Sequence, residues 1–388
     1  MKNILIDITR AFNRRLRDKI PTGIDRVTLE YLRRLADKSR ALVKLHGHYY
    51  IFSERHSADL FTWLLTPASG HITNIVLARM ILKSLISPVP NGCFLFNISH
   101  TELENPKYTE LLKKLHIRPI FMIHDLLPIS HPEYHTTLSS KEHIARIHSS
   151  LSSAAGIICN SQATLNKLTE FACKEMIPMP MTTVALLGPG ISSSISCITT
   201  KRPIDLPYFV ILGTIEPRKN HYLLLQIWRK MAEQYGDKTP RLVIIGNRGW
   251  ECENAIDMLE RCKILKDIVL EHPNCCDEEL ATYLKHAQAL LFPSFCEGYG
   301  LPLVEALSLG VPVVASDLDV FHEIAGDVPE YIDPLDGRQW EEIVHKFSFA
   351  ESPLRIAQME RMKNLKLPTW DEHFTKVNTL MDSLSTKG

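Results

Sequence analysis

The stretch LLFPSFCEGYGLPLVEALSLGVPVVASD, residues 290–317, has the pattern of a strand, a glycine-rich turn, a helix and a second strand. Pro302 suits the first turn of the helix, because its missing N–H would have no partner there. Gly310 suits the position just past the end of the helix, where glycine is common. A helix between two short apolar strands is typical of a parallel α/β sheet.

The turn between this strand and the helix predicts a binding site for phosphate or diphosphate. Gly298, Tyr299 and Gly300 lead into the helix, where free backbone N–H groups and the helix dipole favour an anion. Glu297 precedes the turn and Glu305 lies about one helical turn inside. A carboxylate can accept hydrogen bonds from two neighbouring sugar hydroxyls. The simpler alternative is a tight turn followed by a solvated helix residue.

Strand-like and helix-like segments alternate along the whole chain, which predicts a doubly wound α/β architecture. Apolar runs that we expect to form strands lie at residues 4–8, 93–98, 120–123, 156–159, 183–186, 209–212, 242–245, 289–292 and 311–315. Segments that we expect to be helical lie at residues 26–35, 141–150, 163–171, 222–232 and 278–286.

A change of composition at residues 188–207, GPGISSSISCITTKRPIDLP, marks a boundary between two domains. Turn-forming residues dominate this segment. The sequence YFVILGTIEPRKN that follows it begins like the first strand of a second α/β unit. We therefore expect two Rossmann-like domains, residues 1–200 and residues 201–365. Because open α/β sheets bind ligands at the carboxyl ends of their strands, we expect a cleft between the two domains.

The overall composition excludes several classes of protein. Among 388 residues, 44 Lys and Arg balance 44 Asp and Glu, which argues against a general nucleic-acid binder. Nine cysteines without C-x-x-C spacing disfavour a disulfide framework or a zinc knuckle. Without a signal peptide or a long apolar stretch, we expect a cytoplasmic protein with reduced thiols. The absence of G-x-G-x-x-G argues against a dinucleotide-dependent dehydrogenase.

Charge is nevertheless uneven along the chain. Residues 10–44 contain eleven Lys and Arg against four Asp and Glu, a local charge of +7. Such a stretch can attract anionic lipid or a phosphorylated substrate. It can equally be a solvated loop and helix, and the sequence leaves both interpretations open.

The segment EGYGLPLVE, residues 297–305, is an E-x7-E motif, and its flanks FPS and GVPVVAS are equally specific. With them it resembles the retaining glycosyltransferase family 4, which has the GT-B fold of two Rossmann-like domains with a nucleotide-sugar between them. Further segments resemble the family in the same order: PTGIDRVTLEYLRRL (21–35), MIHDLLPISHPEYH (122–135), GTIEPRKNH (213–221), VIIGNRGW (243–250) and DEELATYLKHAQALLFPS (277–294). In the family a C-terminal helix crosses back to the N-terminal domain, which implies this course for residues 366–388.

The resemblance implies a cationic grip on the donor diphosphate. Lys219 and Arg218 match the basic pair of the family, and fixed cations stabilise the charge that a departing diphosphate gains. Many relatives have a further Arg where this chain has Thr214, so Arg218 is expected to compensate. The family generally needs no metal and no other cofactor.

The resemblance also implies residues that hold the nucleotide-sugar. Glu305 matches the glutamate that binds the ribose hydroxyls, and Glu297 matches the one that contacts the donor sugar. The backbone of Tyr299, Gly300 and Leu301 is expected to hold the β-phosphate.

Two N-terminal residues complete the expected site. His124, just after an expected strand, resembles the family histidine that lies against the donor sugar and the reacting centre. Gly23 matches the glycine that lets the first helix approach the diphosphate and the acceptor. Relatives often have two glycines here, whereas this chain has Thr22 before Gly23.

The resemblance to bacterial mannosyltransferases of surface-polysaccharide assembly implies transfer of mannose from GDP-mannose to a growing glycan on a polyprenyl diphosphate. The basic stretch would then contact the inner face of the membrane. Three alternatives remain open: a UDP-sugar donor, a sugar-nucleotide epimerase of the same fold, and a non-catalytic GT-B subunit.

Overall fold

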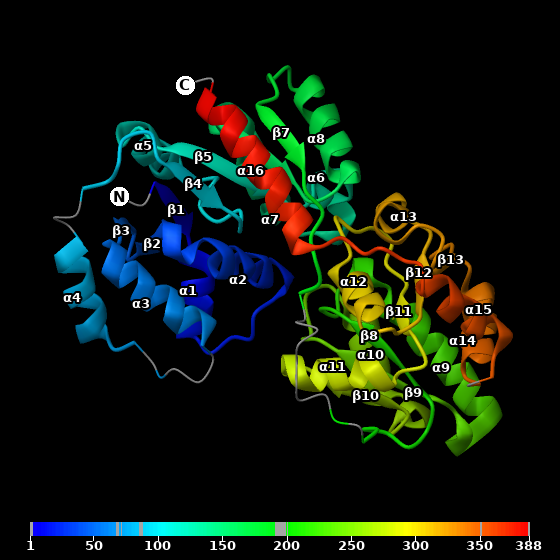
Figure 1. Ribbon diagram of the computed structural model, residues 1–388. Coiled ribbons are helices and arrows are strands. Elements are labelled where there is room, and N and C mark those ends of the chain that lie inside the picture. The colour runs from blue at the N-terminus through cyan, green and yellow to red at the C-terminus, as the bar shows by residue number, and fades with distance from the viewer. Residues whose placement is uncertain are drawn as a thin grey trace. The chain divides into compact units, whose positions relative to one another are not determined.

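The chain forms two compact units in the computed structural model, which describes residues 3–66, 70, 72–84, 88–190, 199, 201–349 and 351–386. Unit 1 comprises Met1–Ala185 and Asp371–Gly388, and unit 2 comprises Leu186–Trp370 (Figure 1). The sequence placed the first boundary at residue 200 and the second at residue 365. Residues 191–198 and 200 of the expected linker lie outside the described residues.

The sheet of unit 1 has seven strands in the order β3-β2-β1-β4-β5-β6-β7. Neighbouring strands are parallel except for β2 and β3, which form a hairpin through His46 and Gly47, both with positive φ. The strand order reverses between β1 and β4, which is where open α/β sheets bind ligands. The strands are β1 Ile4–Asp7, β2 Ser39–Leu45, β3 His48–Ile51, β4 Phe94–Asn97, β5 Arg118–Ile123, β6 Gly156–Cys159 and β7 Met181–Val184.

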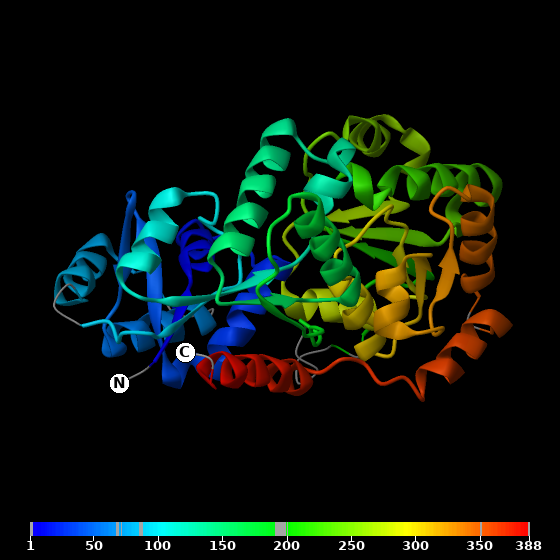
Figure 2. The same ribbon diagram turned by 90° about the horizontal axis from the view of Figure 1, so that it is seen from above.

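Helices cover this sheet, and the last of them comes from the far end of the chain. Helix α16 runs beside the blue N-terminal part of unit 1 (Figure 2). The Tyr31 hydroxyl lies 2.8 Å from His373 Nε2, and the Arg118 guanidinium donates to the Leu384 carbonyl. The helices are α1 Thr9–Leu16, α2 Gly23–Leu35, α3 Glu54–Leu65, α4 Asn74–Ser84, α5 Pro106–Lys114, α6 Leu127–Ser130, α7 Thr137–Ser153, α8 Gln162–Lys174 and α16 Trp370–Thr386.

The sheet of unit 2 has six parallel strands in the order β10-β9-β8-β11-β12-β13. Counted along the unit, this is the order 3-2-1-4-5-6 of the Rossmann fold, with its switch point between β8 and β11. The strands are β8 Tyr208–Leu212, β9 Arg241–Ile245, β10 Val269–His272, β11 Leu290–Phe292, β12 Val313–Ser316 and β13 Glu330–Ile332. The helices are α9 His221–Tyr235, α10 Glu253–Arg261, α11 Asp277–His286, α12 Leu301–Ser308, α13 Asp319–Ala325, α14 Gly337–Phe347 and α15 Pro353–Met362.

The expectation of two Rossmann-like domains is confirmed, with corrections to individual strands. The run at 183–186 was placed two residues late, because the strand is Met181–Val184. Four strands were not expected from the sequence: β2, β3, β10 and β13. The first sheet is therefore mixed, since β3 adds an antiparallel edge to it.

The basic stretch at residues 10–44 has partners within unit 1 at several positions, while Arg17, Lys19, Arg33, Arg34 and Lys38 are exposed. Arg10 and Arg14 both bind the buried carboxylate of Asp25, at 2.9 and 2.8 Å. Arg40 is buried and donates to two backbone carbonyls. The bases with partners inside unit 1 are Arg10, Arg14, Arg15, Arg33, Arg34, Arg40 and Lys44.

Eight cysteines lie in the described part of the chain, and all are free thiols. Cys197 lies outside it. The described residues contain no group of His, Cys, Asp and Glu arranged to hold a metal ion. None of the described helices is both long enough and apolar enough to cross a lipid bilayer.

Candidate functional site

The candidate site of unit 2 lies in the loops that follow β8 and β11, at the switch point of the sheet. The loop after β8 is tied to the loop after β9: the N–H of Ile215 donates to Asn247, and the N–H of Gly249 donates back to Ile215. The chain then enters a short 3-10 turn, Pro217–Lys219 (η3). The neighbouring loop hydrogen bonds to this turn, because the N–H of Phe295 donates to the carbonyl of Arg218.

Glycine is required where these loops cross. A Cβ at Gly246 would lie 2.0 Å from the carbonyl oxygen of Gly213, so no side chain fits. Gly213 itself has a φ of +136°, and a Cβ there would lie 3.3 Å from the Lys219 side chain. Lys219 therefore occupies the space above Gly213, with its ammonium 4.7 Å from the ring centroid of Phe292.

Four charged side chains meet at this point and form alternating ion pairs. Glu297 accepts from Lys219 at 2.6 Å and from Arg218 at 2.8 Å, one cation on each carboxylate oxygen. Arg218 also binds Glu216 at 2.7 Å. The sequence predicted three of these residues, and the structure brings the three together. It did not predict Glu216, although this residue stands beside the expected basic pair.

Burial and the neighbouring charges set the protonation of this cluster. Burial alone would raise the pKa of Glu297, but the charges of Arg218 and Lys219 outweigh it and lower the pKa to about 2. Burial lowers the pKa of Lys219, against the opposing effect of Glu297, and burial raises the pKa of Glu216. Glu297 is therefore ionised at neutral pH. A diphosphate that reaches these cations would compete with its carboxylate.

The turn and helix α12 have the geometry that the sequence predicted. Pro302 is in the first turn of α12 and Gly310, with a φ of +74°, follows its end. Gly300 caps the helix with a φ of +122°, and a Cβ there would lie 2.7 Å from Phe321. The hydroxyl of Tyr299 donates to the backbone carbonyl of Leu187, which anchors the turn within unit 2.

Glu305 lies in α12 and is 1% exposed. The alternative interpretation of this residue as a solvated helix position is therefore wrong. Leu301, the first residue of the helix, follows Tyr299 and Gly300 directly. The anion-binding role of these three residues and the ribose-binding role of Glu305 stay predictions.

In unit 1, His124 follows β5, and both its ring and its backbone have hydrogen-bond partners. Its Nε2 lies 2.6 Å from the carbonyl oxygen of Ile98, which can only accept, so Nε2 carries the proton. Its backbone N–H donates to His100 Nε2, and its carbonyl accepts from Asn160 and Thr164. Burial lowers the pKa of His124, so the neutral imidazole presents Nδ1 as an acceptor.

His100, Asn160 and His143 were not predicted from the sequence. His100 and Asn160 come just after expected strands, at the same sheet edge as His124. Because the carboxyl ends of parallel strands meet at one edge of a sheet, His100 and Asn160 could have been predicted to lie near His124. His143 Nε2 lies 3.1 Å from the carbonyl of Asp125, the residue next to His124. Side chains thus bind the backbone of both His124 and Asp125.

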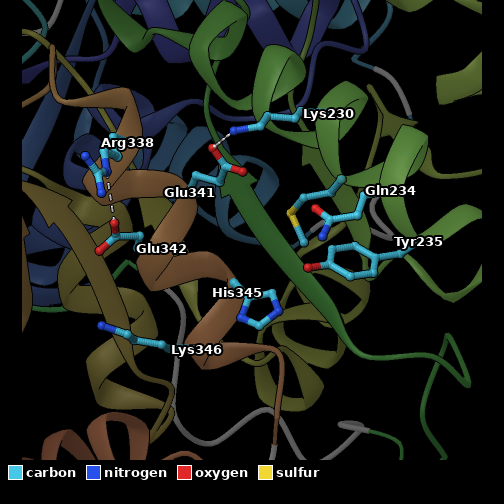
Figure 3. Close-up of a pocket in the computed structure, with 9 residues that line it drawn as sticks. Lys230, Gln234, Tyr235, Arg338, Glu341, Glu342, His345 and Lys346 are labelled. Carbon is cyan, nitrogen blue, oxygen red and sulfur yellow. Dashed lines mark hydrogen bonds and ion pairs between the residues drawn. The ribbon is translucent and has the colours of Figure 1, made fainter.

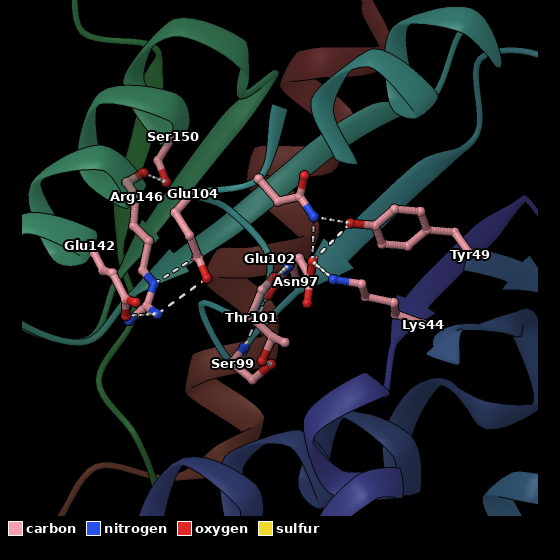
Figure 4. A network of polar contacts seen from close by, with 11 residues as sticks. Lys44, Tyr49, Asn97, Ser99, Thr101, Glu102, Glu104, Glu142, Arg146 and Ser150 are labelled. Atoms are coloured by element: carbon pink, nitrogen blue, oxygen red, sulfur yellow. Dashed lines mark hydrogen bonds and ion pairs between the residues drawn. The ribbon is translucent and has the colours of Figure 1, made fainter. Parts of the chain in front are cut away.

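A second polar network lies near the carboxyl ends of β2 and β4. Lys44 and Tyr49 converge on Glu102, at 2.6 and 2.8 Å (Figure 4). Asn105 donates to the same carboxylate. Partners lower the pKa of Glu102 although burial opposes them. Because these groups satisfy each other, we assign this network to the fold of unit 1.

Gly23 is the first residue of α2, so the helix begins three residues before the start at residue 26 that the sequence predicted. Thr22 precedes it as the N-cap, and both its N–H and its hydroxyl donate to Asp25. Arg10 and Arg14 hold the same carboxylate. The loop with a single glycine is thus fixed by a buried aspartate rather than by a second glycine.

A hollow of about 640 Å³ lies elsewhere on unit 2, between α9 and α14. Lys230 pairs with Glu341 and Arg338 pairs with Glu342 along its walls (Figure 3). None of the predicted site residues lines this hollow. Because four of the five Lys, Arg and Glu side chains that line it are used in these two surface ion pairs, we do not assign it a ligand.

His221, the first residue of α9, supplies a test of stability. It is 2% exposed, and among the described residues neither ring nitrogen has a hydrogen-bond partner. Burial and the charge of Lys219 lower its pKa to about 3, so the ring is neutral. Leucine would remove the unsatisfied polar atoms. We therefore expect His221→Leu to raise the free energy of unfolding by about 1 kcal/mol.

Urea unfolding of the two proteins measures this difference. His286→Leu is the matched control, because His286 is only half-buried and lies 3.0 Å from the Thr199 carbonyl. It should change stability by less than about 0.5 kcal/mol. A clear loss of stability in His221→Leu would contradict this expectation.

Comparison with known proteins finds a match to a family model in the part of the chain that contains these loops. Residues 199–346 match the model described as glycosyl transferases group 1. The matched range contains Arg218, Lys219, Glu297 and Glu305, the charged residues of the predicted donor site.

Two curated relatives from Escherichia coli are similar in sequence to part of this chain. The chain is 29% identical over 218 residues to the serotype-specific mannosyltransferase WbdA, and this match covers 53% of this chain and 26% of WbdA. It is 30% identical over 223 residues to O-antigen chain mannosyltransferase B, which covers 56% of this chain and 58% of that protein. The chain therefore spans about a quarter of one relative and somewhat over half of the other.

Solved structures share the fold of the whole chain. The crystal structure of Anabaena Alr3699/HepE in complex with UDP and glucose matches with a TM-score of 0.67 at 14% identity, covering 100% of this chain and 99% of that chain. This likeness confirms the predicted GT-B fold.

Proposed function

The chain carries a glycosyl transferases group 1 domain on a GT-B fold, and from this premise we propose that it transfers a hexose from a nucleoside-diphosphate sugar to an acceptor hydroxyl with retention. One observation supports this most strongly. Buried Lys219 and half-buried Arg218 share the carboxylate of Glu297, which directly precedes the turn that leads into α12. Cations that can bind a diphosphate and a carboxylate that can bind a sugar thus lie in one cluster.

The proposed reaction breaks the bond between the sugar C1 and the β-phosphate oxygen. A bond from C1 to the acceptor oxygen forms on the same face, and the acceptor proton passes to the departing phosphate oxygen. Lys219, Arg218 and the backbone of Tyr299, Gly300 and Leu301 stabilise the charge of the leaving group. The family generally needs no metal, so these groups supply that stabilisation.

The remaining predicted residues orient the donor and the acceptor. Glu305 binds the ribose hydroxyls and Glu297 the sugar hydroxyls. His124, neutral and fixed by its partners, accepts a hydrogen bond from a sugar hydroxyl through Nδ1. Gly23 leaves space for the diphosphate and the acceptor at the start of α2.

We propose GDP-mannose as the donor and a polyprenyl-linked surface glycan as the acceptor. The two E. coli relatives are mannosyltransferases by name, and the name of one refers to the O-antigen chain. The reaction would then take place at the cytoplasmic face of the membrane. A UDP-sugar is the second candidate donor, because the HepE structure holds UDP and glucose. An epimerase and a non-catalytic subunit remain outcomes of the test.

Thermal shift against GDP, UDP, ADP, dTDP and their common sugars, with and without EDTA, tests the proposal. A ligand that binds only the folded chain raises its melting temperature. At a ligand concentration of 100 times Kd, the free energy of unfolding rises by about 2.7 kcal/mol. We expect GDP and GDP-mannose to act, with no effect of EDTA. The increase should shrink in Glu305→Gln and persist in Glu342→Gln, an exposed control.

Each other outcome changes the proposal. A response to UDP alone would replace mannose by another sugar. Conversion of the donor without any acceptor would indicate an epimerase. No response to any nucleotide would contradict the donor site and favour a non-catalytic subunit.

A further inference from the structure

Helix α4 (Asn74–Ser84) lies at the outer edge of unit 1, next to the edge strand β3 (Figure 1). Its inner side is anchored by Leu77 and Met80, which are 8% and 5% exposed. Three further large apolar side chains point to solvent: Ile75 is 67% exposed, Val76 is 46% exposed and Leu82 is 72% exposed, whereas Ile81 is half-buried. Three neighbouring large apolar residues on one short helix are a patch and not a scatter of single side chains.

The charges on this helix are all positive and lie on the apolar face. Arg79 is four residues after Ile75, and Lys83 is four residues after Arg79, so the three share one side of the helix. Both bases are exposed. No Asp or Glu occurs anywhere between Leu60 and Thr101 in the sequence. The patch is therefore apolar and cationic, with no acidic residue in this part of the chain.

We propose that α4 docks unit 1 onto a membrane surface that contains anionic lipid. Ile75, Val76 and Leu82 would enter the boundary between headgroups and acyl chains. Arg79 and Lys83 have alkyl stems long enough to follow them while their charges stay at the lipid phosphates. This surface is separate from the basic stretch at residues 10–44, in which Arg10, Arg14 and Arg40 have partners inside unit 1.

Charge decides between a membrane and a second copy of the chain. Two copies that paired through α4 in a symmetric dimer would bring the same bases together without any acidic residue to offset them. Anionic headgroups neutralise these bases, at about 1 kcal/mol for each Lys or Arg at the surface. The inference agrees with the proposed lipid-linked acceptor. The test of membrane docking does not require turnover, so the docking proposal and the proposed function can fail independently.

Flotation of the full chain with vesicles tests the proposal directly. One set of vesicles contains phosphatidylcholine alone, and the other also contains phosphatidylglycerol. We expect binding to the anionic vesicles and much weaker binding to the neutral ones. High salt should weaken binding to the anionic vesicles, because it screens the cationic contribution.

Two double variants separate the two contributions. Ile75→Gln with Leu82→Gln should lower the partition coefficient at least about tenfold on the anionic vesicles, because the buried alkyl groups are lost. Arg79→Gln with Lys83→Gln should lower it about 30-fold on anionic vesicles and leave the weak binding to neutral ones unchanged. Leu138→Gln is the matched control, because Leu138 on α7 is a single exposed leucine at 68%. Circular dichroism checks that each variant is folded.

Three results would overturn the proposal. The wild-type chain could fail to bind anionic vesicles, or the α4 variants could bind as well as the wild type. Sedimentation velocity could instead reveal a dimer that Leu82→Gln dissociates, which would assign the patch to a second copy.

Discussion

Replacing Lys219 by methionine is expected to lower turnover by about 100-fold, the usual cost of losing one preorganised stabiliser of a leaving group. Methionine keeps much of the buried volume and removes the charge. Glu297 keeps Arg218 as a partner at 2.8 Å, so the fold of the loop should survive. The measurement is release of nucleoside diphosphate from whichever nucleotide-sugar stabilises the protein in the thermal shift.

Lys230→Met is the matched control for this variant. Lys230 lies on α9 and its side chain is 66% exposed in its pair with Glu341. It should turn over like the wild type. Turnover near the wild-type value in Lys219→Met would contradict the proposed role of Lys219 on the leaving group.

The same variant should also change the response to acid. The depressed pKa of Glu297, about 2 instead of 4.5, contributes stability that is present above pH 4.5 and is lost as the pH falls towards 2. Without Lys219 the pKa of Glu297 should rise towards its ordinary value. Lys219→Met should therefore lose less of its free energy of unfolding between pH 4.5 and pH 2 than the wild type does, which urea unfolding at several pH values measures.

A chain that ends at Trp370 is expected to lose the folded state of unit 1. It lacks five side chains of α16 that are each less than a tenth exposed: His373, Phe374, Val377, Leu380 and Leu384. Removal of one large core side chain costs about 2–5 kcal/mol, so the loss of five exceeds the stability of a typical domain. Tyr31 would also lose its partner His373.

Thermal unfolding followed by circular dichroism, together with limited proteolysis, measures this loss. Protease should cut within residues 1–185 and leave unit 2 resistant. A chain that ends at Thr386 keeps all of α16 and should behave like the full chain. A truncated protein with an intact, protease-resistant unit 1 would show that α16 is dispensable.

The sequence predicts the central strands well because their apolar runs are continuous. It misses β2, whose sequence SRALVKL contains charged residues, and β10, whose sequence VLEH ends in polar ones. Arg40 in β2 is nevertheless buried, because two backbone carbonyls accept its hydrogen bonds. Such burial depends on partners distant in the sequence, so local patterning cannot reveal it.

The candidate site, too, has residues that the sequence predicts and contacts that it misses. Glu297 and Lys219 are predictable together, because their loops follow β11 and β8, which are neighbours in a Rossmann sheet. Asn160 was missed because its contact with the carbonyl of His124 exists only once β5 and β6 pair. The bond from Tyr299 to Leu187 joins the turn to the start of unit 2, and no motif contains it.

The discontinuous course of unit 1 also sets an order of events during synthesis on the ribosome. Its first 185 residues are translated before unit 2, but α16 emerges after it. Until then Tyr31 lacks His373, and Gly156 lacks the leucines that pack over it. Unit 2 can therefore complete its fold while the older part of the chain still exposes an apolar groove. We expect a chaperone to bind that groove until α16 has been translated and covers it.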